Sequence, residues 1–240
     1  MMDDLGSPRL DPDRDGNDPV PQPERADGVS FVFTNKLPIV SEPDSLAAES
    51  IRALRGVLVT QHLNEGRRSL AICSPSAGAG SSFIAANLAV AMAQVGINTL
   101  LVDANLRDPS IQDYIVPSRP VIGLGECLEN DTLPMSSAVQ ALQPSLSVLY
   151  AGHVDAGSHE RIGGSVFKSI MSSCLRDYDL TIVDTPPANR YADARRVASL
   201  ARYALVVACC KRTYLKDVRT LLTEMESDRT TAVGTYLNDY

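Results

Sequence analysis

The fold is decided by residues 69–95, SLAICSPSAGAGSSFIAANLAVAMAQV, where an apolar stretch, a glycine-rich turn and a second apolar stretch follow one another. Ser69–Cys73 is short, continuous and apolar, which is typical of a buried strand in a parallel sheet. The turn Ser74–Ser82 leads into a helix that Gly96 is expected to end. Glycines let backbone N–H groups point into such a turn, and the helix N-terminus adds positive potential. These residues therefore predict a strand–loop–helix unit that can cradle phosphate.

Segments on both sides of this unit alternate between helical and strand patterns. Ser45–Leu63 has apolar residues at helical spacing, and Asn98–Asp103 is an apolar strand segment. Further strands are expected at Leu146–Tyr150, Leu180–Asp184, Ala204–Cys209 and Ala232–Leu237, and further helices at Val166–Leu175, Asp193–Leu200 and Leu215–Met225. The alternation predicts an α/β fold, a mainly parallel sheet with helices on both faces and ligands at the carboxyl ends of the strands.

The composition favours one domain preceded by a tail. The chain has 240 residues, of which 44% are hydrophobic, enough for one sizeable core. Residues 1–28 are acidic and proline-rich with few large apolar side chains, so we expect them to be disordered. Val29–Val40 has short apolar patches; we interpret it as a loosely attached lead-in, with docking on the domain or on a partner as the alternative. We therefore assign residues 1–44 to tail and lead-in, and residues 45–240 to the α/β domain.

Charge and hydropathy exclude several classes of function. The net charge of −7 argues against a nucleic-acid partner. Met1–Leu10 lacks a signal-peptide pattern, and no apolar run approaches the roughly 20 residues of a membrane helix, so we expect a cytoplasmic protein. The five cysteines lack CxxC spacing and are interpreted as reduced and mostly buried.

The phosphate loop departs from the signature Gly-x-x-x-x-Gly-Lys-Ser/Thr at two positions. Pro75 replaces the first glycine and Ser81 replaces the lysine, whereas Ser82 keeps the hydroxyl that binds Mg²⁺. Loss of one charge-assisted bond to phosphate costs about 1.5–3 kcal/mol, or roughly 10- to 150-fold in affinity. Phosphoryl transfer should suffer more, because lysine stabilises charge that develops in the transition state. By this motif alone an ordinary tight turn remains an alternative. The candidate nucleotide-binding residues are Gly78, Ala79, Gly80, Ser81 and Ser82.

Several linked motifs resemble the bacterial tyrosine kinase family, which is related to MinD-type ATPases and works with polysaccharide co-polymerases in capsule and exopolysaccharide export. The resemblance rests on IAANLAVAMAQVGINTLLVDANLRDPSI at 84–111, YDLTIVDTPP at 178–187, ALVVACCKRTYLKDV at 204–218 and AVGTYLNDY at 232–240. It covers roughly residues 45–240 and implies a P-loop NTPase fold of the MinD type, with ATP or ADP and Mg²⁺ as ligands.

The acidic positions implied by the resemblance are partly changed. The family segment Asp-x-Asp-x-Arg here contains Asp103, Asn105 and Arg107, and Asp184 keeps the Walker B position. The amide of Asn105 can ligate weakly but cannot hold negative charge or act as a base. Asp103 and Asp184 are thus the residual catalytic candidates and, with Ser82, the candidate Mg²⁺ ligands; capping of the following turns is their alternative role.

The resemblance also implies a C-terminal tyrosine cluster and an assembly motif. Only Tyr236 and Tyr240 stand near the end of the sequence, so the cluster is missing. Glu49, Arg52 and Arg55 match the Glu-x-x-Arg-x-x-Arg motif through which the family packs protomers into rings; a solvated helix face is the alternative. Arg190, Arg195 and Arg196 form a basic patch that we interpret as surface, with Arg195 and Arg196 on a helix; contact with phosphate or an acidic partner is the alternative.

These departures lead to three hypotheses. The first is a catalytically impaired, tyrosine-kinase-like regulator of a membrane polysaccharide co-polymerase, a chain-length determinant protein, at the inner face of the plasma membrane. The second is an active ATP-dependent autokinase or ATPase in which Arg107, or Arg52 or Arg55 of a neighbour, replaces the lysine. The third is a ParA- or MinD-like positioning ATPase, for which no C-terminal amphipathic membrane helix is visible.

Overall fold

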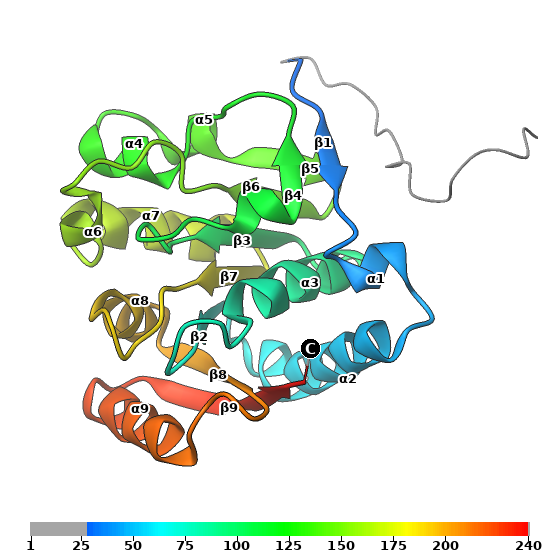
Figure 1. Cartoon of the computed structure of the whole chain (residues 1–240). Coiled ribbons are helices and arrows are strands. Elements are labelled where there is room, and N and C mark those ends of the chain that lie inside the picture. The colour runs from blue at the N-terminus through cyan, green and yellow to red at the C-terminus, as the bar shows by residue number, and fades with distance from the viewer. Residues whose placement is uncertain (1–27, 240) are drawn as a thin grey trace, which may run out of the picture.

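A seven-stranded sheet forms the centre of the computed structural model, which describes residues 28–239 (Figure 1). Its order is β5-β6-β3-β7-β2-β8-β9, and every neighbouring pair is parallel except β5–β6. The strands are β2 (Ser69–Cys73), β3 (Thr99–Asp103), β5 (Gln140–Gln143), β6 (Leu146–Leu149), β7 (Leu180–Asp184), β8 (Tyr203–Cys209) and β9 (Thr231–Asn238). The prediction of a mainly parallel α/β sheet is confirmed.

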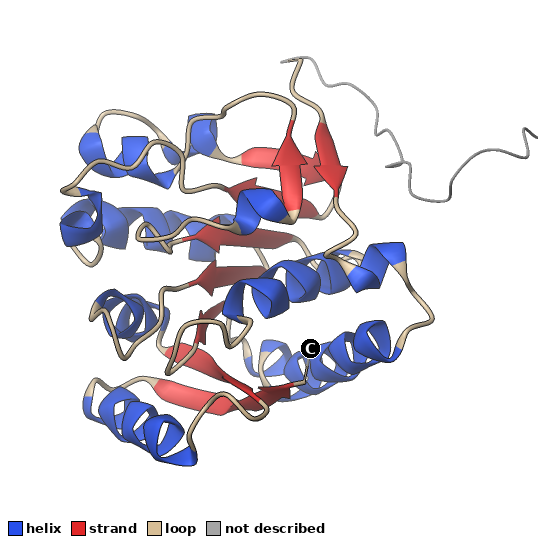
Figure 2. Ribbon diagram, viewed as in Figure 1, coloured by secondary structure: helices blue, strands red, loops and turns tan. Residues whose placement is uncertain are grey.

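Helices cover both faces of this sheet, as predicted (Figure 2). One face carries α2 (Leu46–Gln61) and α3 (Ser81–Ala93), and the other carries α4 (Leu124–Glu129), α7 (Ser165–Asp177), α8 (Asp193–Ala201) and α9 (Leu215–Ser227). Side chains alternate along β3, because Leu101 faces the first layer while Leu100 and Val102 face the second. The shorter helices are α1 (Pro38–Ser41), η1 (Leu63–Glu65), η2 (Ile111–Asp113), α5 (Met135–Ala138) and α6 (Ser158–Arg161).

Helix α3 is the central helix of the fold and begins at the phosphate loop. Its residues 84–92 are all buried, because the sheet lies on one side and α1 and α2 lie on the other. A helix that is apolar all round is expected in such a position. Among the described residues, no helix is both long and apolar enough to cross a bilayer.

The segment that we interpreted as a loosely attached lead-in packs onto the domain. Its strand β1 (Phe31–Phe33) pairs antiparallel with β4 (Ile115–Pro117), and Leu37 and Ile39 are fully buried. The backbone N–H of Ile39 also donates to Asn87 of α3. Burial of these apolar side chains offsets the entropy of ordering a short segment. The acidic tail, residues 1–27, lies outside the described residues, and its disorder stays a prediction.

Candidate functional site

The phosphate loop between β2 and α3 is shaped by two glycines and is braced from β9. Gly78 and Gly80 have φ angles of 73° and 89°, in the left-handed region that favours glycine. A Cβ at Gly80 would collide with the side-chain amide of Asn238 at the end of β9. That amide donates to the carbonyl of Ala79 at 3.1 Å. The loop therefore owes its conformation both to its own glycines and to the last strand.

The loop that follows β7 is joined to the phosphate loop by backbone hydrogen bonds. The N–H of Ala188 donates to Ser74 (2.9 Å), and the N–H of Asn189 donates to Pro75 (3.1 Å). Between the phosphate loop and the loops after β3 and β7 lies a cavity of about 450 Å³, at the carboxyl ends of the strands. It is lined in part by Gly78, Gly80, Ser81, Ser82, Asn105 and Arg107. The structure thus brings together three separate motifs of the sequence.

Two carboxylates lie side by side behind this cavity, because Asp103 and Asp184 are paired across β3 and β7. Both are buried. Burial raises the pKa of Asp103 to about 6, although three backbone N–H groups partly oppose the shift. Burial and the neighbouring Asp103 raise the pKa of Asp184 well above its ordinary value. The pair therefore retains a proton at pH values where exposed carboxylates are ionised.

Asp103 serves as an anchor for the loop that follows β3. Its Oδ1 accepts from the N–H of Asn105, and its Oδ2 accepts from the N–H groups of Ser110 and Ile111, all at 3.1 Å. Asn105 closes the same loop through both atoms of its amide, since Nδ2 donates to the Asp108 carbonyl (2.7 Å) and Oδ1 accepts from its N–H (3.2 Å). An aspartate could not make the first of these two bonds. The amide that breaks the family pattern thus has a structural use.

The oxygen atoms of this site fit Mg²⁺ only in part. Ser82 donates its hydroxyl to Oδ2 of Asp184 at 2.5 Å. Oδ1 of Asp184 is buried and has no hydrogen-bond partner among the described residues, as an acceptor reserved for a cation or water would. Hard oxygen donors of this kind suit Mg²⁺. Asp103 fits less well, because both of its oxygens already accept backbone N–H groups. A metal would thus rest on Ser82 and Asp184.

Arg107 lines the cavity but is engaged within the chain. Its Nε lies 2.9 Å from Oδ2 of Asp193, the first residue of α8, and its guanidinium lies 4.6 Å from the ring centroid of Tyr191. Both contacts fix the side chain at the rim of the site. The guanidinium of Arg107 is thereby paired with the buried carboxylate of Asp193.

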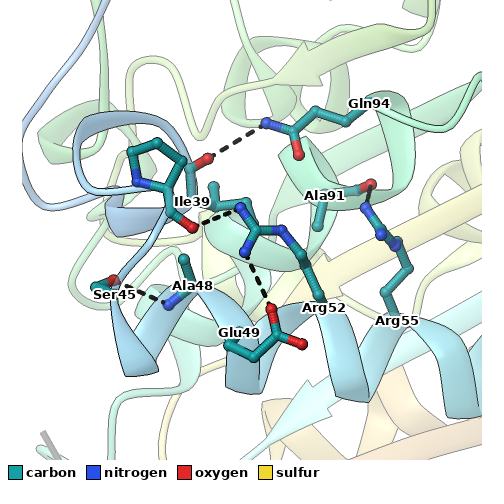
Figure 3. A network of polar contacts seen from close by, with 9 residues as sticks. Ile39, Ser45, Ala48, Glu49, Arg52, Arg55, Ala91 and Gln94 are labelled. Carbon is teal, nitrogen blue, oxygen red and sulfur yellow. Dashed lines mark hydrogen bonds and ion pairs between the residues drawn. The ribbon is translucent and has the colours of Figure 1, made fainter.

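The residues of the assembly motif are bound within their own chain (Figure 3). Arg52 contacts Glu49 at 3.2 Å and donates to the carbonyl of Pro43 at 2.6 Å. Arg55 donates to the carbonyl of Ala91 near the C-terminus of α3 (3.0 Å). Because Ala91 lies ten residues after the start of α3, this contact is about 15 Å from the phosphate loop along the helix. Within one chain Arg55 ties α2 to α3, and Arg52 ties α2 to the segment that precedes it. Self-association through this motif stays a prediction.

The three arginines of the basic patch lie in different places. Arg190 lines the cavity, which favours the alternative of phosphate contact over a plain surface position for this residue. Its place just after the end of β7 is the signal that could have found it. Arg195 and Arg196 lie on α8 as expected; Arg195 pairs with Asp228 at 2.6 Å, and Arg196 lies 3.7 Å from Asp193.

Tyr236 lies in β9, where its hydroxyl shares a hydrogen bond of 2.6 Å with Ser50 of α2. Tyr240 lies outside the described residues.

Comparison of the sequence with known proteins finds tyrosine-protein kinases as relatives. No family model matches the chain. It is 30% identical over 178 residues to the putative tyrosine-protein kinase CapB of Staphylococcus aureus, covering 74% of this chain and 78% of CapB. It is also 30% identical over 203 residues to the tyrosine-protein kinase YwqD of Bacillus subtilis, covering 83% and 84%. Some relatives are longer: the chain spans 27% of the tyrosine-protein kinase ptk of Acinetobacter johnsonii.

Solved structures agree with these relatives. The kinase domain of Escherichia coli Etk superposes with a TM-score of 0.78 at 25% identity, covering 86% of this chain and 80% of that domain. The chimerical protein CapA2B2 gives 0.75 at 28% identity, covering 85% and 89%. The septum site-determining protein MinD of Pyrococcus horikoshii, complexed with Mg-ADP, gives 0.62 at 22% identity over 72% and 70%, a likeness of fold alone. The chain therefore belongs to the family of bacterial tyrosine-protein kinases.

Proposed function

We propose that the chain is a catalytically impaired, tyrosine-kinase-like protein of exopolysaccharide biosynthesis or export. The main support for this proposal is the identity of Ser81, which lines the cavity at the first position of α3. A lysine there would place an ammonium group beside the transferred phosphoryl group, and a serine places only a short neutral hydroxyl. Weak binding of ATP or ADP by Gly78, Ala79, Gly80, Ser81 and Ser82 is part of the proposal, with phosphoryl transfer slow or absent.

The acidic side of the site supports the same proposal. Asp103 and Asn105 are committed to the loop after β3, so neither is available as a base for a tyrosine hydroxyl. Asp184 is bonded to Ser82, and a metal would have to replace that hydrogen bond. If Mg²⁺ binds here, it would supply charge neutralisation for bound phosphates through Ser82 and Asp184.

The role left to such a protein is conformational. We propose that it binds a membrane polysaccharide co-polymerase, a chain-length determinant protein, at the inner face of the plasma membrane. The surface of α2 with Glu49, Arg52 and Arg55 would carry self-association. The support is the family membership and the retention of this motif beside altered catalytic positions.

The test is nucleotide binding and autophosphorylation by the purified chain and two variants. Ser81→Lys restores the charge, and Ser81→Gln is a matched control of similar reach without charge. We expect Ser81→Lys to bind ATP roughly 10-fold tighter or more, with no gain for Ser81→Gln. Titration calorimetry with and without Mg²⁺ measures the affinity. Phosphotyrosine formation by the unaltered chain with ATP and Mg²⁺ would contradict the proposal.

A second candidate function is an active ATP-dependent autokinase or ATPase with a substitute cation. Arg107 favours it, because this side chain lines the cavity. Arg52 and Arg55 do not reach the site of their own chain, so they could act only on that of a neighbour. This function predicts tight Mg²⁺-dependent ATP binding by the unaltered chain and little gain from Ser81→Lys.

A further inference from the structure

Two arginines that the proposed chemistry does not use lie beside the phosphate loop. Arg190, in the loop after β7, lines the same cavity as Ser81. Arg212, in the turn after β8, places its Nη1 3.6 Å from the position that a Cβ on Gly78 would occupy. The two side chains thus approach the glycine-rich turn from separate loops. Helix α3, which follows this turn, contains no lysine or arginine.

The loop that carries Arg190 is hydrogen-bonded to the phosphate loop. The N–H groups of Ala188 and Asn189 donate to Ser74 and Pro75, the first two residues of the phosphate loop. Arg190 therefore follows directly after two residues whose backbone is hydrogen-bonded to that loop. These backbone hydrogen bonds hold the backbone of Arg190 close to the phosphate loop.

The turn that carries Arg212 is held in a similar way. Within it, Thr213 donates its N–H to Cys209 and accepts the N–H of Cys209 on its hydroxyl, both at 2.9 Å. The N–H of Cys210 donates to the carbonyl of Asn238 (2.8 Å), and the amide of Asn238 donates to the phosphate loop. Arg212 is thus placed by a turn that is bonded, through Asn238, to the loop it approaches.

Arg190 lines the cavity, whereas Arg212 lies against Gly78 and is not among the residues that line the cavity. Neither guanidinium forms an ion pair with any residue of the described range 28–239. The neighbouring arginines differ, since Arg107 is paired with Asp193 and Arg195 with Asp228. An unpaired guanidinium beside inward-pointing backbone N–H groups is the arrangement that binds phosphate oxygens.

We propose that Arg190 and Arg212 together supply the positive charge that Ser81 lacks and bind the polyphosphate of a nucleoside di- or triphosphate in the phosphate loop. This inference rests on the proposed function and explains how a site without the lysine would retain a nucleotide. The guanidinium groups reach the ligand from neighbouring loops, so they stabilise the bound nucleotide without occupying the lysine position at the first residue of α3.

The test is fluorescence titration of mant-ADP and mant-ATP with the full chain at low and moderate salt. The variants are Arg190→Gln, Arg212→Gln and the double variant, with Arg219→Gln on the exposed face of α9 as matched control. We expect each single variant to weaken binding about 3- to 10-fold at low salt, the double variant to weaken it further, and both losses to shrink as salt rises. Arg219→Gln should bind as the unaltered chain does. Thermal melting of each variant checks that it is folded.

A second arm uses the Ser81→Lys background. There the restored ammonium shares the phosphates with the arginines, so their removal should cost less than in the unaltered chain. Equal affinity of the double variant and the unaltered chain would refute the inference, as would the absence of detectable binding by the unaltered chain. Either result leaves the proposed loss of catalysis standing. Autophosphorylation by the unaltered chain would refute the proposed function instead, whatever the arginine variants show.

Discussion

Replacing Asp184 by asparagine should stabilise the protein at neutral pH, although this residue lies behind the cavity and is hydrogen-bonded to Ser82 of the phosphate loop. Asp184 is fully buried beside Asp103, and its pKa is raised well above the ordinary value by burial and by that neighbour. The folded state therefore keeps a proton that the unfolded chain releases near pH 4. An asparagine has no proton to retain, and its oxygen can still accept the bond from Ser82.

The magnitude follows from proton linkage. While Asp184 is protonated in the folded state and ionised in the unfolded state, the free energy of unfolding falls by about 1.4 kcal/mol per pH unit. The stability that protonated Asp184 contributes is thus fully present below about pH 4 and is lost as the pH rises through the pKa of the folded state. Above that pKa this contribution no longer changes with pH. Each pH unit over which this holds amounts to about 1.4 kcal/mol, or roughly 3–5 °C in Tm for a domain of this size. The amide N–H would take the place of Oδ1, which already lacks a partner.

The assay is thermal melting of the unaltered chain and Asp184→Asn from pH 4.5 to pH 8. The advantage of the variant should be small at pH 4.5 and grow as the pH rises toward 8. Asp103→Asn is the contrasting control, because it would turn an amide N–H toward backbone donors at Asn105, Ser110 and Ile111 and so lose hydrogen bonds. A variant Asp184→Asn that melts below the unaltered chain at pH 8, or an advantage that does not change with pH, would refute this reasoning.

Two further substitutions test the phosphate loop and helix α2. Gly80→Ala should cost about 2 kcal/mol or more in urea unfolding, because φ is 89° and the new Cβ collides with Asn238, whereas Gly234→Ala, with open space around it, should change stability little. Arg55→Ala should lower the free energy of unfolding by about 1 kcal/mol, since it removes the bond to Ala91, and unchanged stability combined with a loss of self-association would show instead that Arg55 serves assembly alone.

The central elements of the fold could be predicted because local pattern determines them. Leu180–Asp184 and Ser69–Cys73 are continuous apolar runs bounded by polar or turn residues, and the strands have these bounds in the structure. The helix after the phosphate loop was expected to run through Val95 and ends at Ala93. In these segments, burial on both faces of a parallel sheet imposes a composition that the sequence displays directly.

The two-stranded sheet of β1 and β4 could not be predicted in this way. Each strand has three residues, and Phe31 pairs with Pro117, far away in the chain. Its stability comes from burial of Phe31 and Ile115 against the main core, which no local pattern records. Arg212 was missed for the same reason, since its approach to Gly78 depends on the packing of the turn after β8.

The structure also changes what the residues after β3 mean for activity. Asp103 anchors three N–H groups, and Asn105 closes the turn through an amide that a carboxylate cannot imitate. Their presence is thus explained by the loop after β3, whether or not phosphoryl transfer takes place. Ser81 differs, because neither a cap nor any side-chain hydrogen bond is assigned to it within the described residues. Because the fold does not require Ser81, this residue is stronger evidence about catalysis than a residue that the fold requires. Ser81 therefore supports the proposed loss of catalysis more strongly than the retained aspartates oppose it.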